Sequence, residues 1–363
     1  MQKKWLNYLI DPKNKKSLEL KINKSKNGDV IEGCLVSSNG LQKYPIINGI
    51  PRFVPREFYI GSGLSRSDVV QTGRSFGDKW REKTSWKLGQ RKAEIKMLKE
   101  QFLAMLGIKK KKELDKLFKD GINCLNAGCG VAWSEYLFNV NKKTNRFAID
   151  LSLSVEVAHQ RTKNMPNVFV AQADLFQLPF KKKFFDIIFS DGVLHHTGNA
   201  KKAFDSLSKY LKPGGFLGIY VYCKKPFLRE LADREIRKIT TAMPYNKCLE
   251  FSSQVTELGK SLKRFKKPLI VKSDIPLLGI KKGKYNLQKF IYDHFLKCFY
   301  NKNLGHNLSN LTNVDWYHPK YASHHSRKEI KGWFKKNNFS QIKFIQPKGW
   351  EYSGYFVSGR KLK

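Results

Sequence analysis

Between residues 120 and 222, short runs of continuously apolar residues alternate with stretches whose apolar residues recur every three or four positions. Continuous apolar runs are typical of parallel strands buried on both faces, whereas the longer spacing is typical of helices. In "AFDSLSKYL", for example, Phe204, Leu207 and Leu211 share one helical face. The alternation predicts an α/β fold with a doubly wound sheet. The expected strands are "INCLNAG", "RFAIDLS", "NVFVAQAD", "FFDIIFSD" and "GGFLGIYVY".

The segments on either side of this core have different patterns. Residues 1–58 contain short strands separated by turn signals, and residues 59–118 form a Gly- and Ser-rich connection followed by a helix. Residues 223–315 are basic and helix-leaning, which predicts a helical insertion that covers the site as a lid. Residues 316–363 contain a helix and two strands, close enough in sequence to form an antiparallel hairpin. We therefore expect these four parts around a cofactor-binding core in residues 119–222.

The composition limits the class of protein. With 363 residues, of which 41% are hydrophobic, the chain is long enough to bury a substantial core. No apolar run reaches the roughly 18 residues of a membrane-spanning helix, and the first residues lack the apolar stretch of a signal peptide. The six cysteines form no CxxC pair, which argues against a disulfide framework and favours a reducing, cytoplasmic location.

The formal net charge of +39 is the strongest compositional signal. Such a charge attracts nucleic acid or anionic lipid. Nucleic-acid sites, however, usually rely on arginine and on a clustered basic face, whereas here lysine outnumbers arginine and is spread along the whole chain. We therefore favour a compositional origin for the charge and keep nucleic-acid binding as an alternative.

The first core strand ends in a turn that contains two glycines. Gly128 and Gly130 allow a sharp turn and a close approach of the backbone to a ligand. Asp150 and Asp174 end the next two strands, where a carboxylate can accept hydrogen bonds from a ribose or contact an adenine amino group. Each aspartate alone could cap a helix, but their repetition at successive strand ends favours a nucleoside site. A dinucleotide-binding turn would have a third glycine, and Trp133 occupies that position.

Together these motifs resemble a class I S-adenosylmethionine-dependent methyltransferase, and most of all the small-molecule branch often called type 11. The resemblance covers residues 120–222, including the turn "LKPGG". It implies a seven-stranded, mostly parallel Rossmann-like sheet and S-adenosylmethionine as the cofactor. The family usually has an acidic residue where this chain has Asn126, which can form hydrogen bonds but supplies no charge. By resemblance, the cofactor-binding residues are Asn126, Gly128, Gly130, Asp150, Asp174, Leu175 and Ser190.

Residues 1–58 are similar to a small zinc-ribbon-like (Trm112-like) domain found beside some methyltransferases, and they end in the matching segment "YPIINGIPRFV". Two CxxC pairs hold zinc in that family. The corresponding positions here are Asp11, Asn14, Ser37 and Gly40. Because thiolate ligation is the usual basis of such a site, we expect no zinc and a fold that rests on apolar residues. The segments Ser75–Trp80 and Asp315–Phe334 also resemble related methyltransferases, which suggests glycan or secondary-metabolite modification.

Methyl transfer from a sulfonium is an in-line displacement, in which the protein positions the nucleophile and removes its proton. The catalytic candidates are His196, His195 and Asp191, which follow the fourth core strand at the edge where α/β sheets bind ligands. Adjacent histidines rarely converge on one metal ion, and no complementary ligand cluster is present, so we expect no metal site. Further histidines that could approach the site are His318, His324 and His325.

The sequence thus favours methylation of a small-molecule acceptor, and three alternatives stay open. An RNA methyltransferase would use the basic surface, but "SDGVLHH" differs from the Asn/Asp-Pro-Pro-aromatic motif that holds a base amine. An inactive binding protein is suggested by Asn126 and the missing zinc ligands, whereas Asp150 and His196 argue for an enzyme. The glycine spacing disfavours a dehydrogenase. The identity of the acceptor and the oligomeric state are not indicated.

Overall fold

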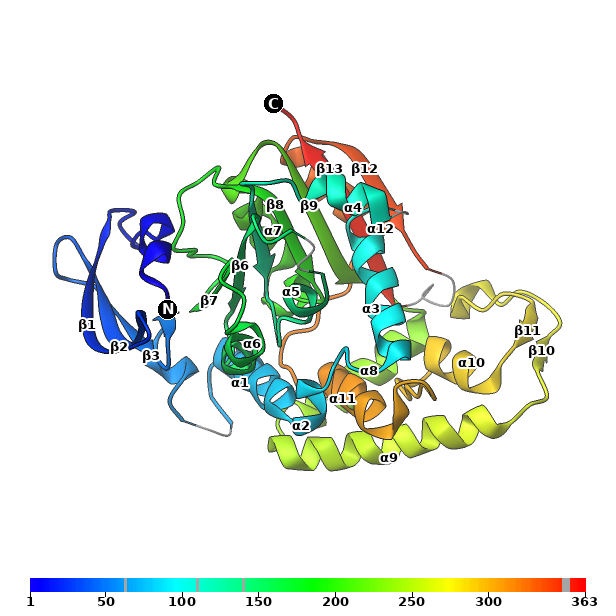
Figure 1. The fold of residues 1–363 in the computed structure, drawn as a ribbon. Coiled ribbons are helices and arrows are strands. Elements are labelled where there is room, and N and C mark those ends of the chain that lie inside the picture. Colours follow the sequence, from blue (N-terminus) through cyan, green and yellow to red (C-terminus); the bar gives the residue numbers. More distant parts are fainter. Residues whose placement is uncertain (62–63, 109–110, 139–140, 348–352) are drawn as a thin grey trace.

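The computed structural model describes residues 1–61, 64–108, 111–138, 141–347 and 353–363. A mixed sheet of eleven strands, in the order β1-β2-β3-β4-β7-β6-β5-β8-β9-β13-β12, runs through the molecule (Figure 1). Its strands are β1 (Leu18–Lys26), β2 (Asp29–Ser37), β3 (Lys43–Ile47), β4 (Ile50–Phe53), β5 (Asn123–Ala127), β6 (Asn145–Asp150), β7 (Val168–Ala173), β8 (Phe185–Asp191), β9 (Leu211–Tyr222), β12 (Phe339–Ile345) and β13 (Gly354–Lys361).

The central part of this sheet is doubly wound. From β5 the chain moves outward through β6 and β7 on one side and through β8 and β9 on the other, and these five strands are parallel. β13 inserts antiparallel between β9 and β12. The seven neighbouring strands from β7 to β12 in this order form the predicted seven-stranded, mostly parallel α/β sheet, so this prediction is confirmed. Ligands bind such sheets where the strand order reverses, here at the carboxyl ends of β5 and β8.

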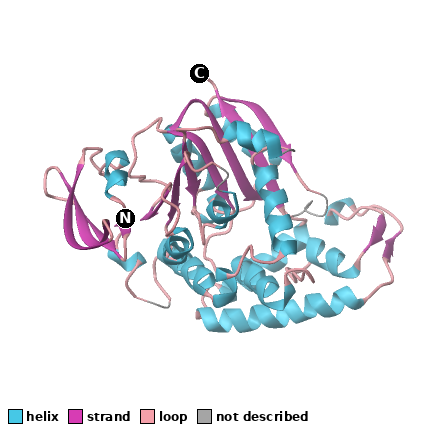
Figure 2. Cartoon of the chain, viewed as in Figure 1, coloured by secondary structure: helices cyan, strands magenta, loops and turns pink. Residues whose placement is uncertain are grey.

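Helices cover both faces of the sheet (Figure 2). They are α1 (Asp68–Arg81), α2 (Lys83–Trp86), α3 (Lys92–Met105), α4 (Lys111–Leu117), α5 (Trp133–Phe138), α6 (Ser154–Thr162), α7 (Ala200–Tyr210), α8 (Phe227–Thr240), α9 (Tyr245–Arg264), α10 (Leu287–His294), α11 (Gly305–Tyr317) and α12 (Arg327–Lys336). Leu125 of β5 joins a core cluster with Phe204 of α7 and Phe334 of α12, whereas its neighbour Cys124 joins another with Phe102 of α3. Because adjacent strand residues face opposite sides, burial on both faces requires the continuously apolar runs of the sequence.

The N-terminal strands β1–β4 form an antiparallel meander that continues the central sheet. β4 pairs in parallel with β7, and Arg52 of β4 donates a hydrogen bond to Gln172 of β7 at 3.0 Å. The ring of Trp5 packs against that of Phe147 in β6, with 5.3 Å between ring centres. Five apolar residues of this region are buried, namely Trp5, Leu9, Leu18, Tyr44 and Ile50.

Asp11 and Ser37, two of the four positions at which the resemblance places zinc ligands, form side-chain hydrogen bonds. The Tyr44 phenol donates to Asp11 Oδ1 at 2.8 Å, and the same oxygen accepts from the backbone N–H of Lys13 at 2.8 Å. The Ser37 hydroxyl donates to Asn39 Oδ1 at 2.6 Å. Within the described residues, no group of three or more His, Cys, Asp or Glu side chains is arranged to hold a metal ion. These contacts tie the loop that contains Asp11 to β3.

Residues 223–315 contain α8, α9, α10 and most of α11, and these helices lie across the end of the sheet to which the parallel strands point (Figure 1). The long helix α9 packs along α11. This region also contains a two-stranded antiparallel sheet of β10 (Leu269–Val271) and β11 (Gly283–Tyr285), which the sequence pattern did not predict. Three-residue strands are too short to establish a period of two. No helix in the described parts of the chain has both the length and the apolar character needed to cross a bilayer.

Candidate active site

A cavity of about 790 Å³ lies at the carboxyl ends of the central strands. Its volume is within the range of about 300–1,000 Å³ that small-molecule sites occupy. The loops after the strands form one side, and residues from α1, α3, α11 and the segment before α11 form the other. The predicted site residues that line it are Asn126, Gly128, Gly130, Asp150, Asp174, Leu175, Asp191 and His196.

The turn after β5 requires glycine for two reasons. Gly128 has a φ of +84°, and a Cβ at this position would lie 2.3 Å from Cγ2 of Val193. Gly130 has a φ of +52° and approaches the ring of Trp80. Both conformations lie in the left-handed region that only glycine adopts without strain. The turn therefore brings the backbone close to the loop after β8, as expected for a ligand-binding turn.

Asp150 and Asp174 are held by backbone groups at the ends of β6 and β7. The N–H of Gly130 donates to Asp150 Oδ2 at 2.9 Å, and the hydroxyl of Ser152 donates to Oδ1 at 2.7 Å. The N–H of Phe176 donates to Asp174 Oδ1 at 2.9 Å, while burial raises the pKa of Asp174 above its usual value. Each carboxylate oxygen has more than one lone pair, so both side chains can still accept bonds from a ligand.

Asn126 has an acidic partner that the sequence did not indicate. Its Nδ2 donates to Glu135 Oε2 at 2.8 Å and to the Ser134 hydroxyl at 3.0 Å. Glu135 is only 1% exposed and its Oε1 lies 4.0 Å from Nε of Arg146. Because Nδ2 is used inside the protein, Oδ1 is the acceptor that Asn126 can offer to a ligand. The carboxylate of Glu135 thus contacts the Asn126 amide from the side that faces the protein interior.

Asp191 supplies a carboxylate on the strand next to Asn126. Gln101 of α3 donates to its Oδ2 at 2.8 Å, and its Oδ1 is buried with no hydrogen-bond partner in the structure. Burial raises the pKa of Asp191 to about 6, against a smaller opposing effect of the Gln101 hydrogen bond. Above that pH the carboxylate is ionised, and it favours a positively charged ligand group nearby.

The two adjacent histidines have different environments. His196 lines the cavity, and its Nδ1 lies 2.6 Å from the carbonyl oxygen of Tyr321. A carbonyl only accepts, so Nδ1 carries the proton and Nε2 of the neutral ring is a proton acceptor. Burial lowers the pKa of His196 to about 4, which keeps the ring neutral at neutral pH. His195 instead stacks on Tyr222, with 3.7 Å between ring centres, and does not line the cavity in the described structure.

Other predicted contacts lie outside the cavity as the structure describes it. Ser190 donates to the carbonyl oxygen of Ala127 at 2.8 Å, so its hydroxyl joins β8 to β5 instead of facing a cofactor. His324 and His325 contact Glu230 and Glu329, respectively. The last such histidine, His318, lies 2.8 Å from the hydroxyl of Ser75. These side chains thus have polar partners inside the protein, and most of these partners lie in segments distant in sequence.

Two charged residues that line the cavity were not predicted from the sequence. Lys79 of α1 forms an ion pair with Asp315 of α11, with 2.7 Å between Nζ and Oδ2. The Lys79 ammonium also lies 3.9 Å from the centre of the Trp80 ring. Lys79 and Asp315 both lie in segments that resemble related methyltransferases, and this resemblance is the feature of the sequence that could have indicated them. Their pairing across 236 positions is decided by the tertiary structure.

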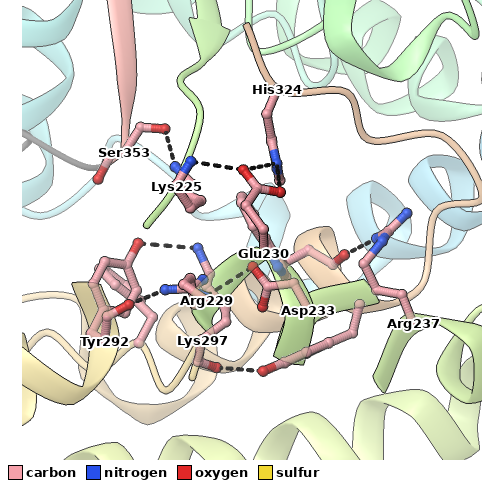
Figure 3. Close-up of polar contacts among 12 residues, drawn as sticks. Lys225, Arg229, Glu230, Asp233, Arg237, Tyr292, Lys297, His324 and Ser353 are labelled. Carbon is pink, nitrogen blue, oxygen red and sulfur yellow. Dashed lines mark hydrogen bonds and ion pairs between the residues drawn. The ribbon is translucent and has the colours of Figure 1, made fainter. Parts of the chain in front are cut away.

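A second group of polar and aromatic residues lines the part of the cavity under the insertion (Figure 3). Lys225, just after β9, donates to the carbonyl oxygen of Ser353 at 2.9 Å. Lys297, between α10 and α11, donates to the Tyr292 phenol at 3.3 Å. Both ammonium groups lie near the ring of Trp316, at 5.2 and 4.8 Å from its centre. No pattern in the sequence connects these residues.

Comparison with known proteins agrees with the strand-end geometry. Residues 125–219 match the family model described as "Methyltransferase domain". The matched segment runs from within β5 to most of β9, and it includes the glycine turn, Asp150, Asp174, Asp191 and His196.

Relatives of the methyltransferase domain are similar over part of their length. The chain is 32% identical to "Probable tRNA methyltransferase 9B" of Bos taurus over 146 residues, which are 39% of this chain and 29% of the relative. It is 30% identical to "Phosphoethanolamine N-methyltransferase" of Triticum aestivum over 130 residues, which are 34% of this chain and 26% of the relative. The matches therefore span less than a third of these curated relatives.

Among solved structures, the N-methyltransferase NodS from Bradyrhizobium japonicum in complex with S-adenosyl-L-homocysteine is similar, with a TM-score of 0.39 and 15% identity. The similarity covers 81% of this chain and 100% of NodS. A complex between the Haloferax volcanii Trm112 methyltransferase activator and a methyltransferase has a TM-score of 0.39 and 12% identity, covering 77% of this chain and 98% of that one.

Proposed function

We propose that this protein is an S-adenosylmethionine-dependent methyltransferase that acts on a small-molecule acceptor. The observation that carries the proposal is one cavity lined both by the residues at the strand ends and by cationic and aromatic residues from Lys225 onward. We interpret these two sets of residues as a cofactor end and an acceptor end. The cofactor end is formed by Asn126, Gly128, Gly130, Asp150 and Asp174, and the acceptor end by His196, Lys225, Lys297 and Trp316.

The residues of the cofactor end suit this cofactor. Asp150 can accept from ribose hydroxyls and Asp174 from an adenine amino group, while Asn126 Oδ1 can accept from an ammonium group. The ionised form of Asp191 adds the negative charge that Asn126 lacks, next to the same turn. S-adenosylmethionine supplies, when bound, an electrophilic methyl group on a positively charged sulfur. The chain's own contribution is to hold the two reactants in line and to exclude water.

His196 is the residue we propose for proton removal. The Tyr321 carbonyl fixes the tautomer in which Nδ1 is protonated, so Nε2 can accept a proton from the nucleophile of the acceptor. The ring is neutral at neutral pH because burial lowers its pKa to about 4.

The insertion supports a small acceptor. Residues of α11 and of the segment before it line the acceptor end, and we propose that the insertion lies over the bound acceptor. The charge of +39 and the tRNA methyltransferase among the relatives favour RNA as the second candidate acceptor. A base would have to leave its stack to reach this cavity.

The proposal is tested with the full chain in two steps. Calorimetry measures the binding of S-adenosylhomocysteine, the demethylated product, and absence of binding by the folded protein would refute the assignment. Methyl-labelled S-adenosylmethionine is then incubated with the protein and either a small-metabolite fraction or total RNA. We expect label in the metabolite fraction, whereas label only in RNA would favour the second candidate, and no label with intact cofactor binding would favour an inactive binding protein.

A further inference from the structure

Lys297 is a buried ammonium group at the acceptor end of the cavity. The residue is 5% exposed and donates to the Tyr292 phenol at 3.3 Å. Its Nζ lies 4.8 Å from the centre of the Trp316 ring and 5.2 Å from that of Tyr292. Among the ion pairs between described residues, none includes Lys297. Burial lowers its pKa to about 7, which reflects how poorly the protein alone compensates this charge.

The acidic groups near Lys297 are committed to other cations. Asp315 pairs with Lys79 at 2.7 Å, and Asp233 pairs with Arg229 at 2.9 Å. Arg229 also donates to the backbone carbonyl of Tyr292 (Figure 3). Each carboxylate thus has a partner of its own, and the Lys297 charge is in excess. Buried charges are stable in proteins when they are paired, so this arrangement favours an anionic ligand.

A second cation lies against the same aromatic ring. The Lys225 ammonium is 5.2 Å from the centre of the Trp316 ring and 5.7 Å from that of Tyr222, and it donates to the Ser353 carbonyl. Figure 3 shows Lys225 and Lys297 reaching this region from different segments of the chain. The indole N–H of Trp316 is buried without a hydrogen-bond partner in the structure. Two ammonium groups and one unused N–H donor therefore converge on one part of the cavity.

We propose that Lys297 and Lys225 bind an anionic group, a phosphate or a carboxylate, of the methyl acceptor. The proposal rests on the methyltransferase function proposed above. The Tyr222 ring lies 5.5 Å from that of His196 and 4.8 Å from that of Trp316, so aromatic rings separate the anion subsite from the proposed base. The acceptor would therefore carry its anionic group at one end and its nucleophile at the other.

The aromatic residues around Lys297 and Lys225 raise an alternative, in which the subsite binds a cationic ligand over the faces of their rings. Here the ring of Trp316 already has Lys225, Lys297 and Arg229 at 5.2, 4.8 and 5.2 Å from its centre. A further cation would meet these three positive charges, whereas an anion would be attracted to them. The observations thus favour an anion.

Calorimetry on the full chain saturated with S-adenosylhomocysteine tests the subsite, with inorganic phosphate, acetate and tetramethylammonium as probes at constant ionic strength. We expect phosphate or acetate to bind and tetramethylammonium not to bind. Lys297→Met retains the apolar stem and should weaken anion binding about tenfold or more, because a charged hydrogen bond is lost. Lys263→Met is the matched control, since Lys263 is an exposed lysine that also lines the cavity.

Three results would overturn the anion subsite: tighter binding of tetramethylammonium than of either anion, no anion binding by the wild-type protein, or equal anion binding by wild type and Lys297→Met. If Lys297→Met fails to fold, Lys225→Met is measured instead and should also weaken anion binding. Failure of the proposed function is distinguishable, because the wild-type protein would then not bind S-adenosylhomocysteine while its response to phosphate could still be measured.

Discussion

The cofactor end of the cavity is built from residues 126 to 174, whereas the acceptor end combines His196 and Lys225 with Lys297 and Trp316 from more distant segments. At the cofactor end Asp150 and Asp174 are held by backbone groups close to the strand ends, as in the contact of Asp150 with the N–H of Gly130. At the acceptor end the contacts join separate elements, as in the hydrogen bond from Lys225 to the carbonyl oxygen of Ser353.

This difference has a physical reason. A parallel sheet aligns the carboxyl ends of its strands, so one residue per strand end is sufficient to place a ligand-binding group. The insertion has no such constraint and can present other side chains on the same scaffold. We therefore expect substitutions at the two ends to separate cofactor binding from acceptor chemistry.

The largest effect is expected for His196→Asn. Asparagine can keep a donor for the Tyr321 carbonyl, but it lacks a counterpart of the accepting Nε2. Turnover should fall by about 100-fold to 1,000-fold, as for loss of a general base, with little change in S-adenosylhomocysteine affinity. The measurement is the transfer rate with the acceptor found by methyl labelling. His195→Phe, which retains a ring against Tyr222, should lose much less, and equal losses would argue against His196 as the base.

Asp150→Ala should reduce S-adenosylhomocysteine affinity about 100-fold, because it removes the carboxylate that we propose accepts two charged hydrogen bonds from the ribose. Calorimetry measures this loss. Asp186→Ala is the control, since Asp186 lies near the start of β8 and pairs with Lys212 away from the cavity. Unchanged affinity in Asp150→Ala would show that the nucleoside of the cofactor does not bind at the carboxyl ends of the strands. The proposed difference between the two ends of the cavity would then not hold.

A smaller effect concerns the pH dependence of cofactor binding. Burial raises the pKa of Asp191 to about 6, so the side chain is ionised above this pH and neutral below it. Affinity for the positively charged S-adenosylmethionine should therefore be constant above pH 6 and fall by about tenfold at more acidic pH. Titrations at several pH values should show this fall in the wild type and not in Asp191→Asn. The same fall in both proteins would assign it to another group.

The smallest effect is expected for Gln101→Leu. The Gln101 amide donates to Asp191 and opposes the upward pKa shift that burial causes. Its removal should move the pH midpoint of cofactor binding upward and leave affinity in the alkaline range unchanged. A midpoint that moves downward would show that Gln101 does not stabilise the ionised carboxylate.

Much of the fold could be predicted from individual residues. The apolar runs around Leu125 and Ile188 required burial on both sides, which is the property of a central parallel strand. Gly128 was predictive because its turn needs a positive φ. Ser190 was predicted from its position at a strand end, but that position does not reveal that its hydroxyl donates to the carbonyl oxygen of Ala127 on the neighbouring strand. The periodicity of apolar residues also did not predict β10 and β11, which pair with each other over three residues.

The sequence by itself determined the order of the strands' apolar runs, the glycine turn and the aspartates at the strand ends, because these depend on local spacing and backbone conformation. Only the tertiary structure decided that His196 lines the cavity while His195 stacks on Tyr222. It also decided that Lys297 and Lys225 meet at Trp316. Contacts between distant segments depend on how the helices pack across the end of the sheet, and local spacing carries no information about that packing.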